Sequence, residues 1–134
     1  MIALHGVTFA YDGHAPVFMD FSWRVGVGEI WSVLGPSGCG KSTLLLLLAG
    51  LLHPQGGTIQ IGGDPIERPR PRTGFILQEY GLLPWATIHD NVALGLRIRR
   101  FYGPDGRHVP QDEDVAGLEV QTRVHHWLSR LDIE

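Results

Sequence analysis

Residues 35–42 read Gly35-Pro36-Ser37-Gly38-Cys39-Gly40-Lys41-Ser42 and match the pattern G-x-x-x-x-G-K-[ST]. Glycines permit the positive φ angles that fold such a loop around an anion, and its backbone N–H groups then converge on phosphate oxygens. Residues 30–34 precede the loop as a short apolar run, which predicts a strand covered on both faces. Residues 41–51 follow it as a leucine-rich helix, apolar all round and therefore expected to be buried. A strand before and a helix after are the context that this phosphate-binding motif requires.

The polar side chains of the loop have distinct predicted roles. Lys41, the only lysine of the chain, would place its ammonium on the β- and γ-phosphates of a nucleotide. Ser42 would ligate Mg²⁺ through its hydroxyl, and Thr43 would reach the α-phosphate through its hydroxyl and N–H. Cys39 is interpreted as a small residue in a variable position, with a redox switch as the alternative. For the whole loop, the alternative is a glycine turn that matches by chance. The expected nucleotide-binding residues are Gly35, Pro36, Ser37, Gly38, Cys39, Gly40, Lys41, Ser42 and Thr43.

Composition limits the class of protein. The chain has 134 residues, of which 43% are apolar, enough for about one domain and too many for a disordered segment. The net charge of −3 gives no bulk positive field, so we expect no nucleic-acid partner. A single cysteine excludes an internal disulfide framework. The chain shows no secretory signal, and its longest uncharged apolar stretch, residues 44–52, is far shorter than the roughly 20 residues of a membrane span. These features predict a cytoplasmic protein.

The segments around the loop predict further strands. Residues 17–25 alternate apolar with polar side chains, which is typical of an antiparallel strand with one wet face. Residues 2–11 predict a second strand with a bulge at Gly6, where the apolar phase changes. Residues 58–61 and 74–77 predict two more strands. The arginine- and proline-rich residues between them predict an exposed loop.

The last third of the sequence predicts helices. Thr87 and Asp90 have the spacing of a capping box that opens a helix. Residues 102–114 are rich in glycine, proline and charge, and predict a loop. One face of a final helix is formed by Val120, Val124, Trp127, Leu128 and Leu131. Together, these elements predict an α/β fold.

Additional motifs accompany the phosphate loop. Gly28-Glu29 leads into the strand before it, and Ala49-Gly50-Leu51 follows its helix. Further along the chain stands Phe75-Ile76-Leu77-Gln78-Glu79. With these motifs the sequence resembles the ATP-binding subunit of ABC transporters. The Leu-Leu-Pro-Trp stretch at 82–85 and Asp90-Asn91-Val92 extend this resemblance. The Leu-Pro-Trp version is similar to the nitrate, sulfonate and taurine importer branch more than to other branches.

The resemblance implies a function, cofactors and partners. It implies ATP and Mg²⁺ as cofactors, with Lys41 and Gln78 in catalytic roles and Gln78, the Q-loop residue, joining Ser42 on the metal. Tyr11 occupies the place of the aromatic residue that stacks on adenine, and a core-facing strand residue is its alternative. Region 80–95 would meet a membrane permease, with subdomain packing as the alternative. A second copy of the subunit, and indirectly a solute-binding protein, would complete an importer on the inner face of the cell membrane.

The resemblance also implies a division of the chain. We expect a single partial ATP-binding domain over 1–134, with an antiparallel β subdomain at 1–27. A P-loop core with the Q-loop would cover 28–86, and the beginning of a helical subdomain 87–134. The family's signature motif, second acidic motif, catalytic glutamate and switch histidine are absent from these residues. We therefore expect an N-terminal fragment that does not hydrolyse ATP alone. A small-molecule kinase, a non-catalytic nucleotide-binding module and a DNA-repair relative remain as alternatives.

Overall fold

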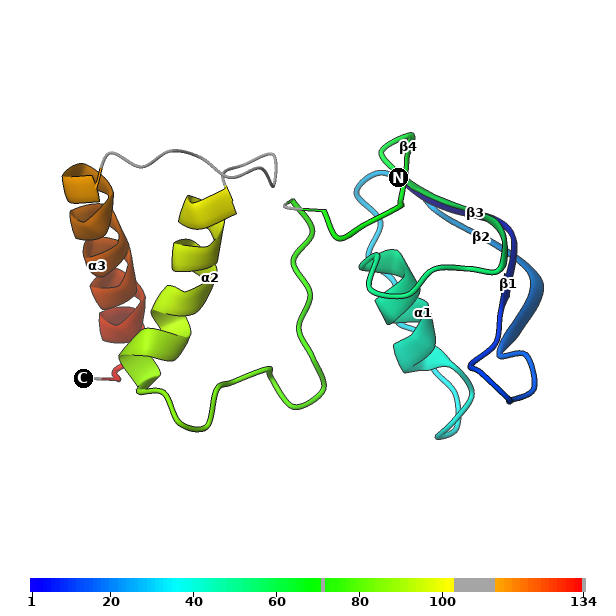
Figure 1. The fold of residues 1–134 in the computed structure, drawn as a ribbon, viewed down its shortest axis with the longest axis horizontal. Helices are drawn as coiled ribbons and strands as arrows, with labels where there is room; N and C mark the ends of the chain where they lie inside the picture. Colours follow the sequence, from blue (N-terminus) through cyan, green and yellow to red (C-terminus); the bar gives the residue numbers. More distant parts are fainter. Residues whose placement is uncertain (71, 103–112, 134) are drawn as a thin grey trace. The chain divides into compact units, whose positions relative to one another are not determined.

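The computed structural model describes residues 1–70, 72–102 and 113–133, and it divides the chain into two units, residues 1–73 and 74–134. Most of the predicted loop at 102–114 lies outside the described residues. Figure 1 labels the elements along the chain. In order they are β1 (Ile2–Phe9), β2 (Phe18–Val25), α1 (Lys41–Leu48), β3 (Gly56–Ile61), β4 (Asp64–Pro65), α2 (Ile88–Tyr102) and α3 (Glu113–Arg130).

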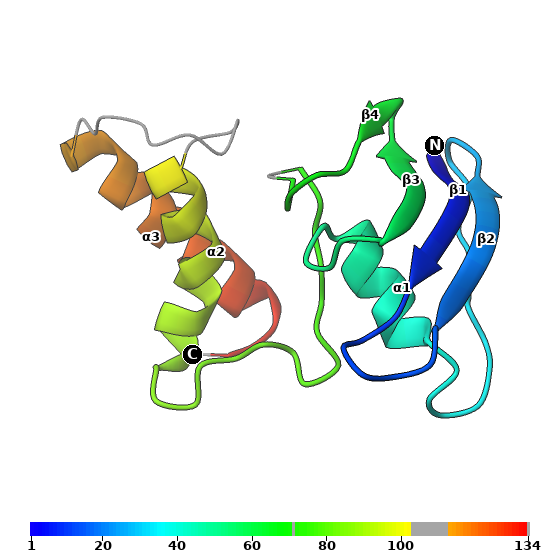
Figure 2. The ribbon, with the colours of Figure 1, turned by 45° about the vertical axis from the view of Figure 1, so that its right-hand side comes forward.

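The first unit contains an antiparallel sheet with strand order β2-β1-β3-β4. The predicted strands at 2–11, 17–25 and 58–61 are confirmed, although β1 ends at Phe9, two residues earlier than expected. Figure 2 shows the strands of this sheet, with α1 packed against one of its faces. The unit is thus a two-layer arrangement of sheet and helix.

The predicted bulge at Gly6 is confirmed, and it explains which side chains of β1 reach the core. The register along β1 shifts between Leu4 and Val7 against β2, and between His5 and Thr8 against β3. Gly6 has a φ of +58° at this point. Because one extra residue changes the alternation, Leu4 and Val7 can both face the helix despite their odd spacing.

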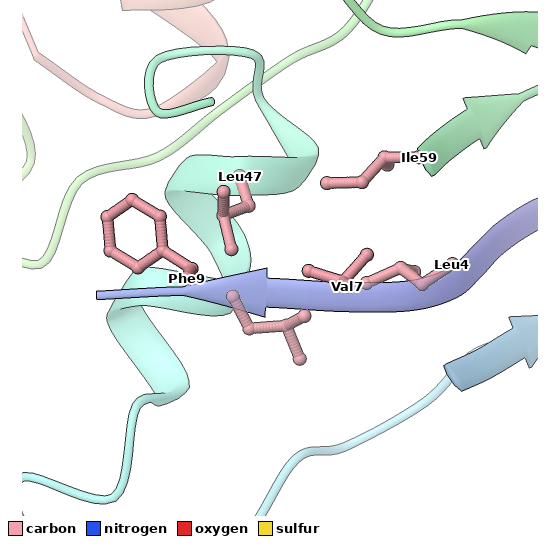
Figure 3. Packing of buried hydrophobic residues seen from close by; sticks show 6 residues of the cluster. Leu4, Val7, Phe9, Leu47 and Ile59 are labelled. Atoms are coloured by element: carbon pink, nitrogen blue, oxygen red, sulfur yellow. The ribbon is translucent and has the colours of Figure 1, made fainter. Parts of the chain in front are cut away.

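The core of the first unit lies between this face of the sheet and α1 (Figure 3). Leu47 of α1 is fully buried there, beside residues of β1 and Ile59 of β3. The opposite side of the helix is open, because Leu45 is about half exposed. The expectation of a helix buried all round was therefore wrong. The buried cluster consists of Leu4, Val7, Phe9, Leu44, Leu47 and Ile59.

Two predicted strands do not form. Residues 30–34 have no strand conformation, and Ile30 and Leu34 are 98% and 90% exposed. Residues 74–77 also lack strand conformation, and Ile76 is exposed. An apolar run becomes a strand only through ladder hydrogen bonds with a neighbour, and no described residue pairs with either run. Both predictions were therefore wrong for the described residues.

The second unit contains α2 and α3, which lie side by side and run in opposite directions (Figures 1 and 2). The predicted cap by Thr87 is confirmed, because its Oγ1 accepts a hydrogen bond from the Asp90 N–H at 3.1 Å. The second bond differs from that of a capping box: Asp90 Oδ2 accepts from the Thr87 hydroxyl at 2.8 Å and not from the Thr87 N–H. Ala93 of α2 and Val124 of α3 are fully buried. Val124 belongs to the predicted apolar face of the last helix, whereas Trp127 on that face is about half exposed.

Candidate functional site

The phosphate loop joins residues 30–34 to the first turn of α1. Gly38 and Gly40 have φ values of +80° and +95°, the left-handed region that glycine adopts without strain. A Cβ at Gly40 would lie 2.6 Å from Val17 Cγ1, so the loop also packs too tightly there for a side chain. The helix starts at once, since the Leu44 N–H donates to the Gly40 carbonyl at 2.8 Å.

The N-terminal end of α1 has a partial positive charge that no side chain of its first turn neutralises. Gly40 is the N-cap and no side chain caps the helix, and its first turn contains no acidic residue. The first N–H groups of a helix have no partners within the helix, and they lie at the positive end of its dipole. Such an arrangement attracts an anion and, because no carboxylate competes there, it suits a phosphate group.

Lys41 lies over the same loop. Its Nζ donates to the carbonyl oxygens of Gly35 at 2.8 Å and Pro36 at 2.6 Å, and it lies 3.6 Å from Cys39 Sγ. The ammonium is therefore bound by the carbonyl oxygens of the two residues that begin the loop. The positive charge of Lys41 thus lies within the loop that leads into the N-terminus of α1.

Tyr11 is brought next to the first turn of α1. Its hydroxyl oxygen lies 3.1 Å from Thr43 Oγ1, although the two residues are far apart in the sequence. The Tyr11 ring meets the Phe9 ring edge-on, with centroids 5.0 Å apart and an interplanar angle of 86°. Because β1 ends at Phe9 and Tyr11 stays 41% exposed, the alternative of a core-facing strand residue was wrong.

Gln55 is a residue of this site that the sequence did not single out. Its Oε1 accepts from the Ala10 N–H at 3.1 Å, and its Nε2 donates to the Ala10 carbonyl at 3.3 Å. The Gln55 N–H also donates to the Thr8 carbonyl at 2.8 Å. Gln55 thus continues the ladder of β1 with its side chain and fixes the backbone directly before Tyr11. Its position just ahead of β3 is the only sequence signal, and many glutamines share such a position.

Glu29 supports the segment that enters the loop. One oxygen of its carboxylate accepts from the Gly26 N–H at 2.7 Å and from Trp31 Nε1 at 2.9 Å. The Gly26 N–H first, and the Trp31 N–H second, hold the pKa of Glu29 below its ordinary value. The Trp31 ring in turn meets the Trp23 ring of β2 edge-on, at 5.6 Å.

Gln78 belongs to the second unit and not to the unit that holds the phosphate loop. It is exposed and begins a turn that continues through Tyr80, whose φ is +62°. The structure therefore brings Tyr11, Lys41, Ser42 and Thr43 together within one unit, and the role of Gln78 stays a prediction.

The segment after Gln78 presents apolar side chains and is held by Asn91. The Asn91 carboxamide accepts from the Leu83 N–H at 2.7 Å and donates to the carbonyls of Leu83, Ala86 and Thr87. Trp85 is 81% exposed on this held loop. The exposed apolar surface of the segment comprises Tyr80, Leu82, Trp85 and Ile88.

Comparison with known proteins gives matches to ABC transporter proteins along most of the chain. A family model described as ABC transporter matches residues 18–134. The chain is 48% identical over 129 residues to the taurine import ATP-binding protein TauB of Escherichia coli O157:H7, which covers 94% of this chain and 44% of that protein. It is 46% identical over 94 residues to the TauB protein of Chromobacterium violaceum, covering 69% of this chain and 36% of that protein. The chain thus spans less than half the length of these relatives.

Solved structures support the same fold. A dimeric bacterial ABC transporter cassette superimposes with a TM-score of 0.72 and 28% identity, covering all of this chain and 58% of the other. A dimeric ATP-binding cassette in a post-hydrolysis state, bound to ADP and Pi, gives a TM-score of 0.75 at 24% identity, with the same coverage. The fold is therefore that of a P-loop ATPase cassette, with the antiparallel sheet and helices described above. In the described part of the chain, no helix is both long and apolar enough to cross a membrane.

Proposed function

The chain belongs to the ABC transporter family. We propose that it is part of the ATP-binding subunit of an importer of this family. In the proposed activity, ATP binding and hydrolysis by the complete gene product drive the transport of a solute through a membrane permease. The TauB relatives are named for taurine import, which supports a sulfonate as the transported solute. The proposed location is the cytoplasmic face of the cell membrane.

One observation carries the nucleotide part of this proposal: backbone N–H groups, a helix N-terminus and the Lys41 ammonium meet at one loop, with no carboxylate in the first helical turn. This donor set fits the triphosphate of ATP. Ser42 would hold Mg²⁺, which neutralises phosphate charge when bound, and Thr43 would donate to the α-phosphate. Tyr11 would offer its ring to adenine. The remaining proposed binding residues are Gly35, Pro36, Ser37, Gly38, Cys39 and Gly40.

The second unit supplies the other proposed contacts. Gln78 would complete the Mg²⁺ site and orient the attacking water, because a neutral amide can do both without adding charge. Residues 80–95 would bind the permease, which the exposed Trp85 and Leu82 and the Asn91 contacts support. The proposed subdivision remains a β subdomain at 1–27, a P-loop core at 28–86 and a helical subdomain from 87.

We further propose that the 134 residues alone do not hydrolyse ATP. Hydrolysis needs an in-line water and Mg²⁺ held from two sides, and these residues contain neither a second acidic motif nor a catalytic glutamate. The complete gene product would act as a homodimer, because the family's signature motif faces the nucleotide of the partner subunit. A solute-binding protein would act through the permease.

The test is ATP hydrolysis by the complete gene product, reconstituted with its permease in lipid vesicles. We expect phosphate release that rises when the transported solute is supplied, and that Lys41→Ala abolishes. The 134-residue chain, assayed in parallel, should release no phosphate above the Lys41→Ala background. Solute-independent phosphate transfer to a small acceptor would instead identify a kinase. Lys41-dependent turnover by the 134 residues would refute the statement about this chain alone.

A further inference from the structure

The contact between Tyr11 and Thr43 connects two ends of the proposed nucleotide site. Their hydroxyl oxygens lie 3.1 Å apart, across 32 residues of sequence. Thr43 is only 6% exposed, in the first turn of α1, whereas Tyr11 follows β1 and stays 41% exposed. The Phe9 ring holds the Tyr11 ring edge-on, which limits the directions that the phenol can take.

The chemistry of two hydroxyl groups gives this contact a direction. A hydroxyl has one hydrogen and two lone pairs, so Thr43 can accept one hydrogen bond and donate another. A phenol is a stronger hydrogen-bond donor than an aliphatic alcohol, so the Tyr11 hydroxyl is the better donor of the two. When Tyr11 donates, the hydrogen of Thr43 is left for a further acceptor. The nearby helix N-terminus favours an acceptor that is negatively charged.

We infer that Tyr11 acts on the phosphate end of the bound nucleotide as well as on its base, by donating its hydroxyl hydrogen to Thr43, which donates its own to a phosphate oxygen. This inference rests on the proposed function. Chains of hydrogen bonds polarise one another, so the phenol strengthens the bond that Thr43 makes. It also fixes the Thr43 side chain in one orientation before the ligand arrives. Tyr11 is in this respect a positioning residue.

Variants of the complete gene product separate the ring of Tyr11 from its hydroxyl. Tyr11→Phe keeps the ring and removes the hydroxyl. Thr43→Val removes the acceptor with little change in shape, and Thr43→Ser keeps it. Thr58→Val makes the same change as Thr43→Val at an exposed threonine of β3 in the same unit, and serves as the matched control. The dissociation constant of ATP–Mg, measured by calorimetry, is the readout, with thermal melting to show that each variant folds.

The expected pattern is a coupling between the two hydroxyls. Tyr11→Phe should weaken ATP binding about two- to tenfold, the range for one neutral hydrogen bond. The same change should have less than about a twofold effect in the Thr43→Val background, and its full effect in the Thr43→Ser background. Thr58→Val should bind like the wild type. An equal effect of Tyr11→Phe in the Val and Ser backgrounds, or none in the wild type, would overturn the inference.

A second measurement applies even if Thr43→Val abolishes binding. In the free protein, NMR couplings across the Thr43 Cα–Cβ bond should report one side-chain rotamer in the wild type and averaged rotamers in Tyr11→Phe. A single rotamer in both proteins would contradict the positioning role. Failure of the proposed function is a separate outcome, because it would appear as absence of ATP binding by the wild type.

Discussion

The carboxamide of Asn91 binds both backbone polar groups of Leu83: Oδ1 accepts from the Leu83 N–H at 2.7 Å, and Nδ2 donates to the Leu83 carbonyl at 3.1 Å. The same Nδ2 also donates to the carbonyls of Ala86 and Thr87. A residue of the first turn of α2 thereby fixes the loop that precedes the helix. The exposed Trp85 lies on that loop, so the shape of the proposed permease-binding surface depends on one side chain.

We expect Asn91→Ala to destabilise the second unit by about 1–3 kcal/mol, because it leaves part-buried backbone groups without their partners. Urea unfolding followed by the tryptophan signal would measure the change. His89→Ala, an exposed neighbour on α2, should stay within about 0.5 kcal/mol of the wild type. Equal stability of the Asn91→Ala variant and the wild type would show that the loop is held by other contacts.

Trp85→Ala should leave stability unchanged and weaken binding to the permease. The side chain is 81% exposed, so its removal takes little apolar area out of a folded core. Aromatic anchors of interfaces typically lose more than about 1 kcal/mol of binding free energy on truncation to alanine. Trp127→Ala, at a half-exposed tryptophan of the same unit, is the matched control. Co-purification of the subunit with its permease is the measurement, and equal recovery of both variants would count against the proposed surface.

Gln55→Ala should weaken ATP binding about two- to fivefold, because the backbone before Tyr11 loses two hydrogen bonds and the ring loses its fixed position. Gln55→Glu keeps the acceptor for the Ala10 N–H and loses the donor, so an intermediate effect is expected. Gln121→Ala, on the exposed surface of α3, is the control. Calorimetric titration of the wild type and the three variants with ATP–Mg gives their dissociation constants. If Gln55→Ala binds ATP as tightly as Gln121→Ala does, Gln55 has no part in positioning Tyr11.

Gly57→Ala should destabilise the first unit far more than Gly62→Ala. Both glycines have positive φ, +79° and +68°, so each alanine is strained by about 1–2 kcal/mol. A Cβ at Gly57 would also lie 2.4 Å from the carbonyl oxygens of His5 and Gly6, whereas a Cβ at Gly62 meets nothing within 4 Å. The added overlap with β1 should raise the total for Gly57→Ala above about 3 kcal/mol. Chemical denaturation of both variants tests this, and similar midpoints would contradict it.

Glu29 should titrate at lower pH than an ordinary glutamate. Its carboxylate is stabilised by the Gly26 N–H and then by the Trp31 N–H, so its pKa is lower in the folded than in the unfolded chain. The stabilisation is therefore present above the unfolded pKa and is lost as pH falls through the folded pKa. Trp31→Phe removes one of the two donors. NMR titration should show a higher pKa for Glu29 in that variant, and an unchanged pKa would show that the tryptophan does not contribute.

Much of the first unit could be predicted from local patterns. The alternation in residues 17–25 and the phase change at Gly6 report one buried face and a bulge, and both depend only on neighbouring residues. The phosphate loop was recognisable for a similar reason, because glycines at this fixed spacing before Lys41 and Ser42 indicate a phosphate-binding loop and few other structures. The Thr87–Asp90 cap is equally local, because its hydrogen bonds span three residues.

The features that escaped prediction depend on contacts between distant segments. Residues 30–34 have the composition of a buried strand, yet composition cannot supply the neighbouring strand that makes the ladder. The same holds for residues 74–77. Gln55 and its hydrogen bonds to Ala10 span 45 residues, and nothing in the sequence around Gln55 indicates that partner. The Tyr11–Thr43 contact is of the same kind.

The most direct test of the account is the binding of ATP–Mg to the complete gene product, measured by equilibrium dialysis with labelled nucleotide. Lys41→Ala is compared with Arg24→Ala, which removes an exposed cation from β2 of the same unit. We expect saturable binding by the wild type and by Arg24→Ala, and a loss of at least about tenfold in affinity for Lys41→Ala. Equal retention of nucleotide by all three proteins, or none by the wild type, would contradict it.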